Sequence, residues 1–213
     1  MSSKSWEAQA PQKLEKAVTQ LEWGPGPNLL SASLQGFGLY IMNDTILHKK
    51  LSDTCAAIQT SSDRVTIEDF KEESIVLKTG IRVKGLDVSE NLVVVWDGKR
   101  AEVYECHIHE GGTRKVSTFP TDSKFIEIIG NGAVDKAAIY CATGNKIKVC
   151  NPEGVVRDSY QFSESEGNVI LLDINGRYMA AATDSGAVRV FKLDKSGKKI
   201  GQMVDIHSNP PTV

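Results

Sequence analysis

The sequence has no apolar run that approaches the ~20 residues required by a membrane-spanning helix. Its first stretch, MSSKSWEAQAPQKLEKA, is polar and lacks the apolar core of a secretory signal peptide. A basic excess is also missing, because 25 lysines and arginines face 27 aspartates and glutamates, for a formal net charge of −2. We therefore expect a globular protein of one or two domains, with no direct membrane insertion and no general affinity for nucleic acid.

Cysteine is scarce, and its spacing matches no common metal or redox motif. The four cysteines contain no CxxC pair and stand inside or at the ends of expected strands. Buried or half-buried free thiols in a cytosolic protein are the expectation for Cys55, Cys106, Cys141 and Cys150. The alternative for two of them is a disulfide, since Cys141 and Cys150 flank one expected hairpin.

Helical patterns are almost absent, and motifs that need a helix are absent with them. The sequence contains no GxSxG turn, and Gly24-Pro25-Gly26 lacks the downstream lysine and helix of a phosphate-binding loop. The acidic residues that stand out in loops are interpreted as parts of solvated turns, not as a pair held for acid–base catalysis. These residues are Glu72, Glu73, Glu164 and Glu166.

What the sequence does contain is a series of short apolar runs separated by turn residues. Between 162 and 193 the runs are 169–174, 178–182 and 187–191, with turns at Asn175-Gly176 and Asp184-Ser185-Gly186. Each run has the length of a β-strand, and the glycines supply the positive φ of tight hairpins. In the last run Val188 and Val190 alternate with Arg189, which predicts that the valines line the buried face.

The same pattern recurs along the chain. Two more hairpins are expected at 91–105 and 137–149, and the turn glycines Gly98, Gly144 and Gly186 are 46 and 42 residues apart. A spacing of about 40 to 45 residues is typical of WD40-type propeller blades with four strands each. The sequence therefore predicts an all-β, WD40-like β-propeller, in which Val94, Val103, Ile139, Leu172 and Val190 are buried between blades.

About five blade units are expected, which favours an incomplete propeller from a longer chain over the alternative of an unusually small closed ring. The first unit is assigned strands 18–23, 28–34, 38–42 and 45–51, and the second, short unit only three strands, 56–60, 65–70 and 75–78. The others span 83–119, 125–162 and 169–206. The domain assignment is an extended segment at 1–14, a partial propeller at 15–206 and a disordered tail at 207–213. Uncovered blades expose strand edges, so we expect the isolated chain to associate.

Three groups of side chains stand out as possible sites. Cys106-His107-Ile108-His109-Glu110 is the best metal candidate, but His48 and His207 are far away in sequence and no second acidic cluster is evident, so no metal and no cofactor are predicted. A basic group near the last loop indicates a solvated turn or, as the alternative, a surface for an acidic partner. Its members are Lys192, Lys195, Lys198 and Lys199. Trp23, Trp96 and Phe191 are expected in packing between blades.

A propeller enzyme would place polar residues at the starts of the inner strands, around the channel. Here the assigned starts are mostly apolar, which favours a non-enzymatic interaction module without catalytic residues. These starts are Val18-Thr19, Ala56-Ala57, Val83-Lys84, Phe125-Ile126 and Val169-Ile170. A propeller hydrolase with carboxylates or a metal at the channel is the alternative from another class.

Three segments resemble, in order and spacing, the second WD40-like propeller of the intraflagellar transport protein 140 family. They are VTQLEWGPGPNLLSAS (18–33), VKGLDVSENLVVVWDGKRAEVYE (83–105) and FSESEGNVILLDINGRYMAAATDSGAVRVFKLD (162–194). The most specific parts are the VVWDGKRAEVYE hairpin and the FSESEGN run, and the resemblance covers most of residues 15–194. It implies a scaffold subunit of intraflagellar transport complex A that acts in retrograde ciliary transport, cilium assembly and ciliary entry of membrane proteins.

The resemblance also implies partners and a location. The partners are other subunits of complex A and ciliary cargo adaptors, and the location is the cilium or flagellum, including its base, and the cytoplasm. The family offers no catalytic residues. Its plan includes a first propeller, further blades and a helical tail that this sequence lacks, so we expect a fragment. Another WD40 scaffold, such as a vesicle-coat or dynein-linked subunit, is the alternative within the class.

Overall fold

The computed structural model describes residues 14–24, 29–43, 47–71, 73–130, 133–194 and 197–207. Over these residues the chain is built from antiparallel strands, as the hairpin pattern predicted. Helix is confined there to three single turns of 3₁₀ type, η1 (Ile108–Glu110), η2 (Val134–Lys136) and η3 (Glu164–Glu166). The predicted segments 1–14 and 207–213 lie, except for residues 14 and 207, outside the described part of the chain.

The chain divides into two compact units, residues 1–46 and residues 47–213. The first unit holds one three-stranded sheet, β1 (Val18–Trp23), β2 (Leu29–Leu34) and β3 (Gly38–Asn43). Its apolar side chains are largely exposed, including Leu21 and Trp23, while Ala32 is buried. In its described residues this unit contains one sheet, so within it Trp23 has no second sheet to pack against, and its packing between blades stays a prediction.

The fourth strand assigned to the first unit belongs to the next sheet. Lys49–Leu51 forms β4 and pairs with β5 (Cys55–Ser61), so that the second sheet is complete, with β6 (Arg64–Asp69) and β7 (Ser74–Lys78). The expectation of three strands in the second unit is therefore wrong, because a tight turn folds 49–51 back. Ser52 closes this turn: its N–H donates to the Cys55 carbonyl at 2.8 Å, and its Oγ accepts the Cys55 N–H at 3.2 Å.

The other three sheets follow the predicted meanders closely. The third sheet consists of β8 (Gly85–Ser89), β9 (Leu92–Trp96), β10 (Arg100–His107) and β11 (Gly112–Pro120). The fourth consists of β12 (Phe125–Ile129), β13 (Ala138–Thr143), β14 (Lys146–Cys150) and β15 (Val156–Gln161). The fifth consists of β16 (Val169–Asn175), β17 (Tyr178–Thr183), β18 (Ala187–Leu193) and β19 (Lys199–His207). The turn glycines Gly98, Gly144 and Gly186 all have positive φ, as predicted.

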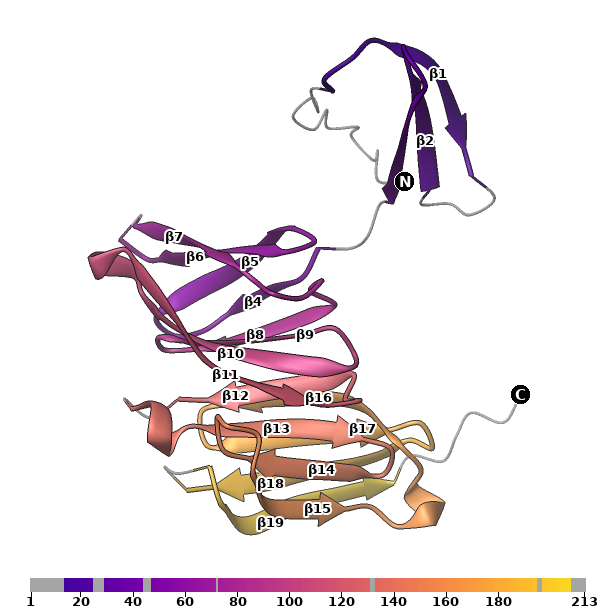
Figure 1. Ribbon diagram of the computed structural model, residues 1–213. Helices are drawn as coiled ribbons and strands as arrows, with labels where there is room; N and C mark the ends of the chain where they lie inside the picture. Colours follow the sequence, from indigo (N-terminus) through magenta and orange to yellow (C-terminus); the bar gives the residue numbers. More distant parts are fainter. Residues whose placement is uncertain are drawn as a thin grey trace, which may run out of the picture. The chain divides into compact units, whose positions relative to one another are not determined.

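Within the 47–213 unit the four sheets pack against one another in chain order (Figure 1). The first strand of each sheet is the innermost: β4 contacts β8, β8 contacts β12, and β12 contacts β16. The later strands of each meander run outward from this inner row. This is the radial arrangement of an incomplete β-propeller, since the sheets form no closed ring in the described residues.

The sheets are held together by apolar cores between their faces. β9 shows why: all five of its residues are buried, with Val93 and Val95 in the core shared with the second sheet, and Leu92, Val94 and Trp96 in the core shared with the fourth. A third core joins the fourth and fifth sheets around Tyr140, Phe162 and Phe191. A strand that is buried on both faces has a continuous apolar sequence, as residues 92–96 do.

Of the five side chains predicted to be buried between blades, Val94, Val103, Ile139 and Leu172 are buried, and Val190 is only half-buried. The buried face of β18 carries Ala187, Phe191 and Leu193, so the assignment of faces in this strand is wrong. The reason is Arg189, which shares the buried face, stacks 4.7 Å from the centre of the Phe162 ring and pairs with Glu166 at 2.5 Å.

The corrected faces predict different costs for two truncations. Ile139 has no exposed surface, so Ile139→Ala should lower the free energy of unfolding by about 2–5 kcal/mol through lost burial and the cavity that it leaves. Val190→Ala removes a half-buried side chain and should cost less than about 1 kcal/mol. Urea denaturation of both variants measures the difference. Equal losses would show that the sheet faces are misassigned.

The two end sheets of the 47–213 unit each carry an apolar row on the face turned away from their neighbour. On the second sheet Ile58 and Val76 flank Thr66 across three paired strands, with Ile58 36% and Val76 58% exposed. On the fifth sheet Leu171, which is 60% exposed, pairs with Ala182, and Ala182 pairs with Val188. Within the described residues of this unit no further sheet packs on these two faces, and exposed apolar faces favour association.

We therefore expect the purified chain to associate in static light scattering, and expect the double variant Val76→Lys/Leu171→Lys to lower the average mass. The added charges would have to be desolvated in any contact that covers these rows. Val155→Lys is the control, because Val155 is 61% exposed but lies in a turn outside the sheets. A monomeric wild-type chain with a sharp cooperative melt would contradict this prediction.

Candidate functional site on the inner strands

Charged side chains meet where the four inner strands of the 47–213 unit run side by side. Each strand contributes one residue: Lys50 from β4, Asp87 from β8, Glu127 from β12 and Asp173 from β16. Lys50 is central, since its Nζ lies 2.9 and 2.8 Å from the two carboxylate oxygens of Glu127 and 3.1 Å from Asp173 Oδ1. One ammonium group thus links three sheets.

Asp87 is the most buried member of this axial cluster, with 2% of its surface exposed. Its Oδ2 accepts the backbone N–H of Ile128 at 2.7 Å, which fixes the carboxylate against the neighbouring sheet. Its Oδ1 is buried and lies 3.7 Å from Lys50 Nζ, and its carboxyl group also shares a side-chain hydrogen bond with Glu127. Because Lys50 already donates to Glu127 and Asp173, the positive charge is shared unequally among the three carboxylates.

Burial and crowding shift the proton affinities of this cluster. Burial, followed by the negative charge of Asp87, raises the pKa of Glu127 to about 8, although Lys50 opposes the shift. Burial likewise raises the pKa of Asp87, again against the effect of Lys50. Burial alone would lower the pKa of Lys50, but the charges of Asp87 and Glu127 outweigh it and hold that pKa above its ordinary value. The cluster can therefore hold one proton besides the lysine charge.

A cavity of about 360 Å³ opens beside the cluster, lined by residues of the four inner strands and the turns that follow them. Its charged lining consists of Lys50 and four acidic residues, Asp53, Asp87, Glu90 and Glu127. Negative charge dominates this space, so its chemistry suits a positively charged group rather than an anion.

This site was not predicted from the sequence, because its residues do not lie at the expected starts of the inner strands. Ala56-Ala57 belongs to the second strand of its sheet, and Val18-Thr19 to the first unit. The charged residues stand in the middle of the inner strands, in GLDVS, FIEII and VILLDIN. One acidic residue within an otherwise apolar inner strand was the available signal.

The structure separates the two histidines of the predicted metal candidate. His107 lies 3.6 Å from Glu105, whereas His109 reaches across to the β6–β7 turn of the second sheet. There its Nδ1 lies 2.5 Å from Glu73 Oε2, and its Nε2 lies 3.7 Å from Asp69 Oδ2. The sequence did not indicate this acidic pair. Asp69, Glu73 and His109 each bring one potential ligand atom within 4.8 Å of the others, so this group, and not His107 with His109, is the arrangement that could hold a metal ion.

The acidic residues that were expected in solvated turns differ in their burial. Glu166 was assigned to a solvated turn but is buried; it accepts the Ser163 N–H at 2.6 Å in a capping box and pairs with Arg189. Glu164 is exposed, as expected, and Glu72 lies outside the described residues.

Trp96 is buried, and its indole N–H donates to the Lys124 carbonyl at 3.2 Å. Gly85 leaves space for the indole ring, since a Cβ at this position would lie 2.3 Å from a ring atom.

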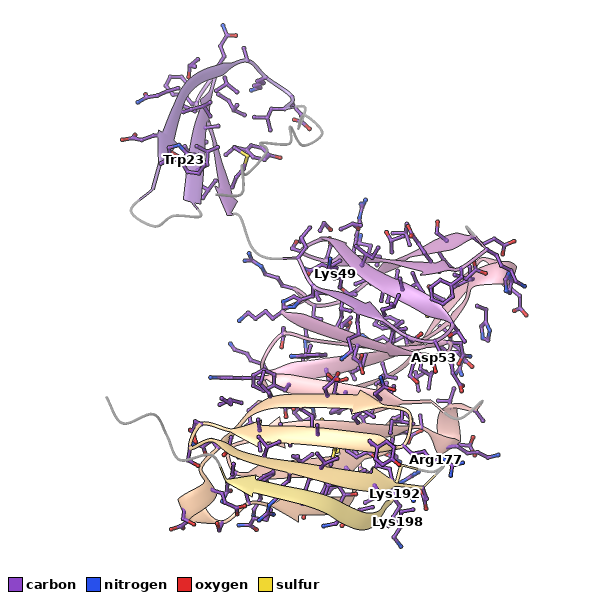
Figure 2. The ribbon with its side chains drawn as sticks, turned by 180° about the vertical axis from the view of Figure 1, so that it is seen from behind. Trp23, Lys49, Asp53, Arg177, Lys192 and Lys198 are labelled. Atoms are coloured by element: carbon purple, nitrogen blue, oxygen red, sulfur yellow. The ribbon has the colours of Figure 1, made fainter. Side chains whose placement is uncertain are left out.

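The members of the predicted basic group have different surroundings in the structure. Figure 2 shows Lys192 and Lys198, together with Arg177, at one end of the fifth sheet, and both lysines are exposed. Lys199 instead lies over the Phe191 ring at 4.6 Å, and Lys195 falls outside the described residues.

All four cysteines are free and buried, as predicted. The thiols of Cys141 and Cys150 share a hydrogen bond that holds the pKa of Cys141 above its usual range.

The packed four-stranded meanders and their inner row define a propeller domain. Residues 53–209 match the family model described as IFT140 second beta-propeller, and the chain belongs to this family. Propellers of this family are scaffold-type domains. In the described residues, no helix has the length and apolar character needed to cross a membrane.

The axial cluster predicts a pH dependence of stability. Since the pKa of Glu127 is about 8 in the folded chain against 4.5 ordinarily, the folded chain holds an extra proton between these values. Stability therefore falls as pH rises from about 4.5 to 8. Glu127→Gln should reduce this loss by on the order of 2 kcal/mol, measured by urea denaturation at pH 5 and pH 8. Glu68→Gln, at an exposed site on β6, should leave it unchanged.

Proposed function

We propose that this chain is part of a non-enzymatic scaffold subunit of intraflagellar transport complex A. The observation that carries the proposal is the family match over residues 53–209, which includes every strand of the 47–213 unit except β4. The proposed processes are retrograde ciliary transport, cilium assembly and the entry of membrane proteins into cilia. The proposed location is the cilium, including its base, and the cytoplasm.

The packing of the sheets supports a scaffold role. Three apolar cores tie four sheets into one unit, so side chains on its turns and end faces keep fixed positions relative to one another. A rigid framework with variable loops suits the binding of several partners at once. The proposed partners are other subunits of complex A and ciliary cargo adaptors. The apolar rows on the two end sheets are the faces that we propose are covered in the assembly.

Affinity capture from ciliated cells tests this proposal. We expect the tagged full chain to recover other subunits of complex A and to concentrate at the ciliary base. The double variant Leu171→Lys/Val188→Lys should recover less, because it places charge on the end face of the fifth sheet, while Val155→Lys should recover as much as the wild type. Recovery of chaperones alone would contradict the proposed role.

A further inference from the structure

Three side chains of metal-binding types meet between the second and third sheets. Asp69 ends β6, Glu73 precedes β7, and His109 belongs to η1, the single turn that follows β10 and contacts β6 (Figure 1). One ligand atom of each lies within 4.8 Å of the other two. His109 stands in the best metal candidate of the sequence, Cys106-His107-Ile108-His109-Glu110, for which no second acidic group was evident. The packing of the two sheets provides that group.

Asp69 is held in a fixed position by the turn that follows it. Its Oδ1 accepts the backbone N–H groups of Lys71 at 2.9 Å and Glu73 at 3.0 Å, and its side chain is 11% exposed. Its Oδ2 points to the imidazole and lies 3.7 Å from His109 Nε2. Two nitrogen or oxygen ligands of a tetrahedral zinc ion lie about 3.3 Å apart, so this pair is within a few tenths of an ångström of ligand spacing.

The other two ligands are free to adjust, and there is room for the rest of a coordination shell. Glu73 and His109 are both exposed, and their present contact of 2.5 Å, between Glu73 Oε2 and His109 Nδ1, can open without loss of buried surface. A cavity of about 490 Å³ adjoins the group and includes Asp69 and His109 in its lining. It can admit a water molecule as a fourth ligand.

The donor atoms select zinc among the common divalent cations. Magnesium and calcium prefer oxygen ligands, and calcium requires six to eight of them, whereas imidazole nitrogen suits zinc. The group offers one nitrogen and two carboxylates from separate segments of chain. The alternative is a protonated His109 that pairs with both carboxylates, and zinc binding would displace that proton.

We propose that Asp69, Glu73 and His109 bind a zinc ion that ties the β6–β7 turn of the second sheet to η1 of the third. The inference goes beyond the proposed scaffold function, because it does not depend on membership in complex A. An ion that binds only the folded chain raises its stability, so the bound zinc would oppose separation of these two sheets.

Calorimetric titration of the purified full chain with zinc chloride tests the site, with no histidine tag on the protein. We expect one equivalent to bind with micromolar affinity. At free zinc about 100-fold above the dissociation constant, the melting temperature should rise by about 5–10 °C. Magnesium chloride is the control for simple attraction to carboxylates and should have neither effect. Absence of zinc binding at submillimolar concentration, or an equal response to magnesium, would overturn the proposal in favour of the charge pair.

Histidine variants locate the bound ion. His109→Ala removes the nitrogen ligand and should weaken zinc binding by at least about tenfold, since even partners that only orient a ligand contribute that much. His107→Ala is the matched control, because His107 lies two residues away beside Glu105, outside the group, and its loss should leave zinc binding unchanged. Equal losses in the two variants, or no loss in His109→Ala, would overturn the assignment.

A second variant guards against a folding defect. Glu73→Gln keeps the size of an exposed side chain but removes its charge, and it should also weaken zinc binding. Glu68→Gln, on the exposed side of β6, should not. If His109→Ala lowers the melting temperature of the metal-free chain, the comparison of these two glutamine variants decides, and equal zinc affinities in both would overturn the proposal.

Discussion

The whole structure depends on covering both faces of each sheet. β9 illustrates this constraint. Its five consecutive residues are all buried, and because their side chains alternate between the two faces of the sheet, a neighbouring sheet is needed on each side. A single four-stranded meander with such a strand is unstable in water, and packing it between two others removes apolar surface from both faces. The same requirement that builds the cores leaves the outer faces of the second and fifth sheets with exposed apolar rows.

Packing the sheets radially also brings their first strands together, and this crowding creates the axial cluster. Four charged residues from β4, β8, β12 and β16 are placed where little water reaches two of them. Removing Asp87 and Glu127 from water is costly, and a lysine in contact with three carboxylates offsets only part of that cost. The remaining part appears as a raised proton affinity of Glu127, whose carboxyl group shares a hydrogen bond with Asp87.

Much of the fold was predictable because local signals sufficed. The hairpin glycines Gly98, Gly144 and Gly186 take positive φ and mark three sheets that the sequence located within a few residues. β4 was misplaced because Lys49–Leu51 is too short to show alternation, and its pairing depends on a turn at Ser52. β18 was assigned the wrong buried face because Arg189 looks like a solvent residue but has its charge paired with Glu166.

The candidate sites were less predictable, because their members come from different sheets. Lys50 and Asp173 are separated by 123 residues and meet only at the inner row, and His109 meets Glu73 across two sheets. Periodicity assigns residues to faces but does not give the order in which sheets pack. Composition, by contrast, sufficed for the cysteines, which are all free and buried.

The separation of the three cores has a consequence for cooperativity. Each core is shared by two adjacent sheets, and the core around Ile67 contains no residue of the core around Phe191. The apolar cores therefore couple only adjacent sheets, as in a chain of nearest-neighbour interactions, and the axial cluster adds a direct link from Lys50 of the second sheet to Glu127 and Asp173 of the fourth and fifth. Opening of the second sheet would leave the core between the fourth and fifth sheets intact but would remove the lysine that pairs with their two carboxylates.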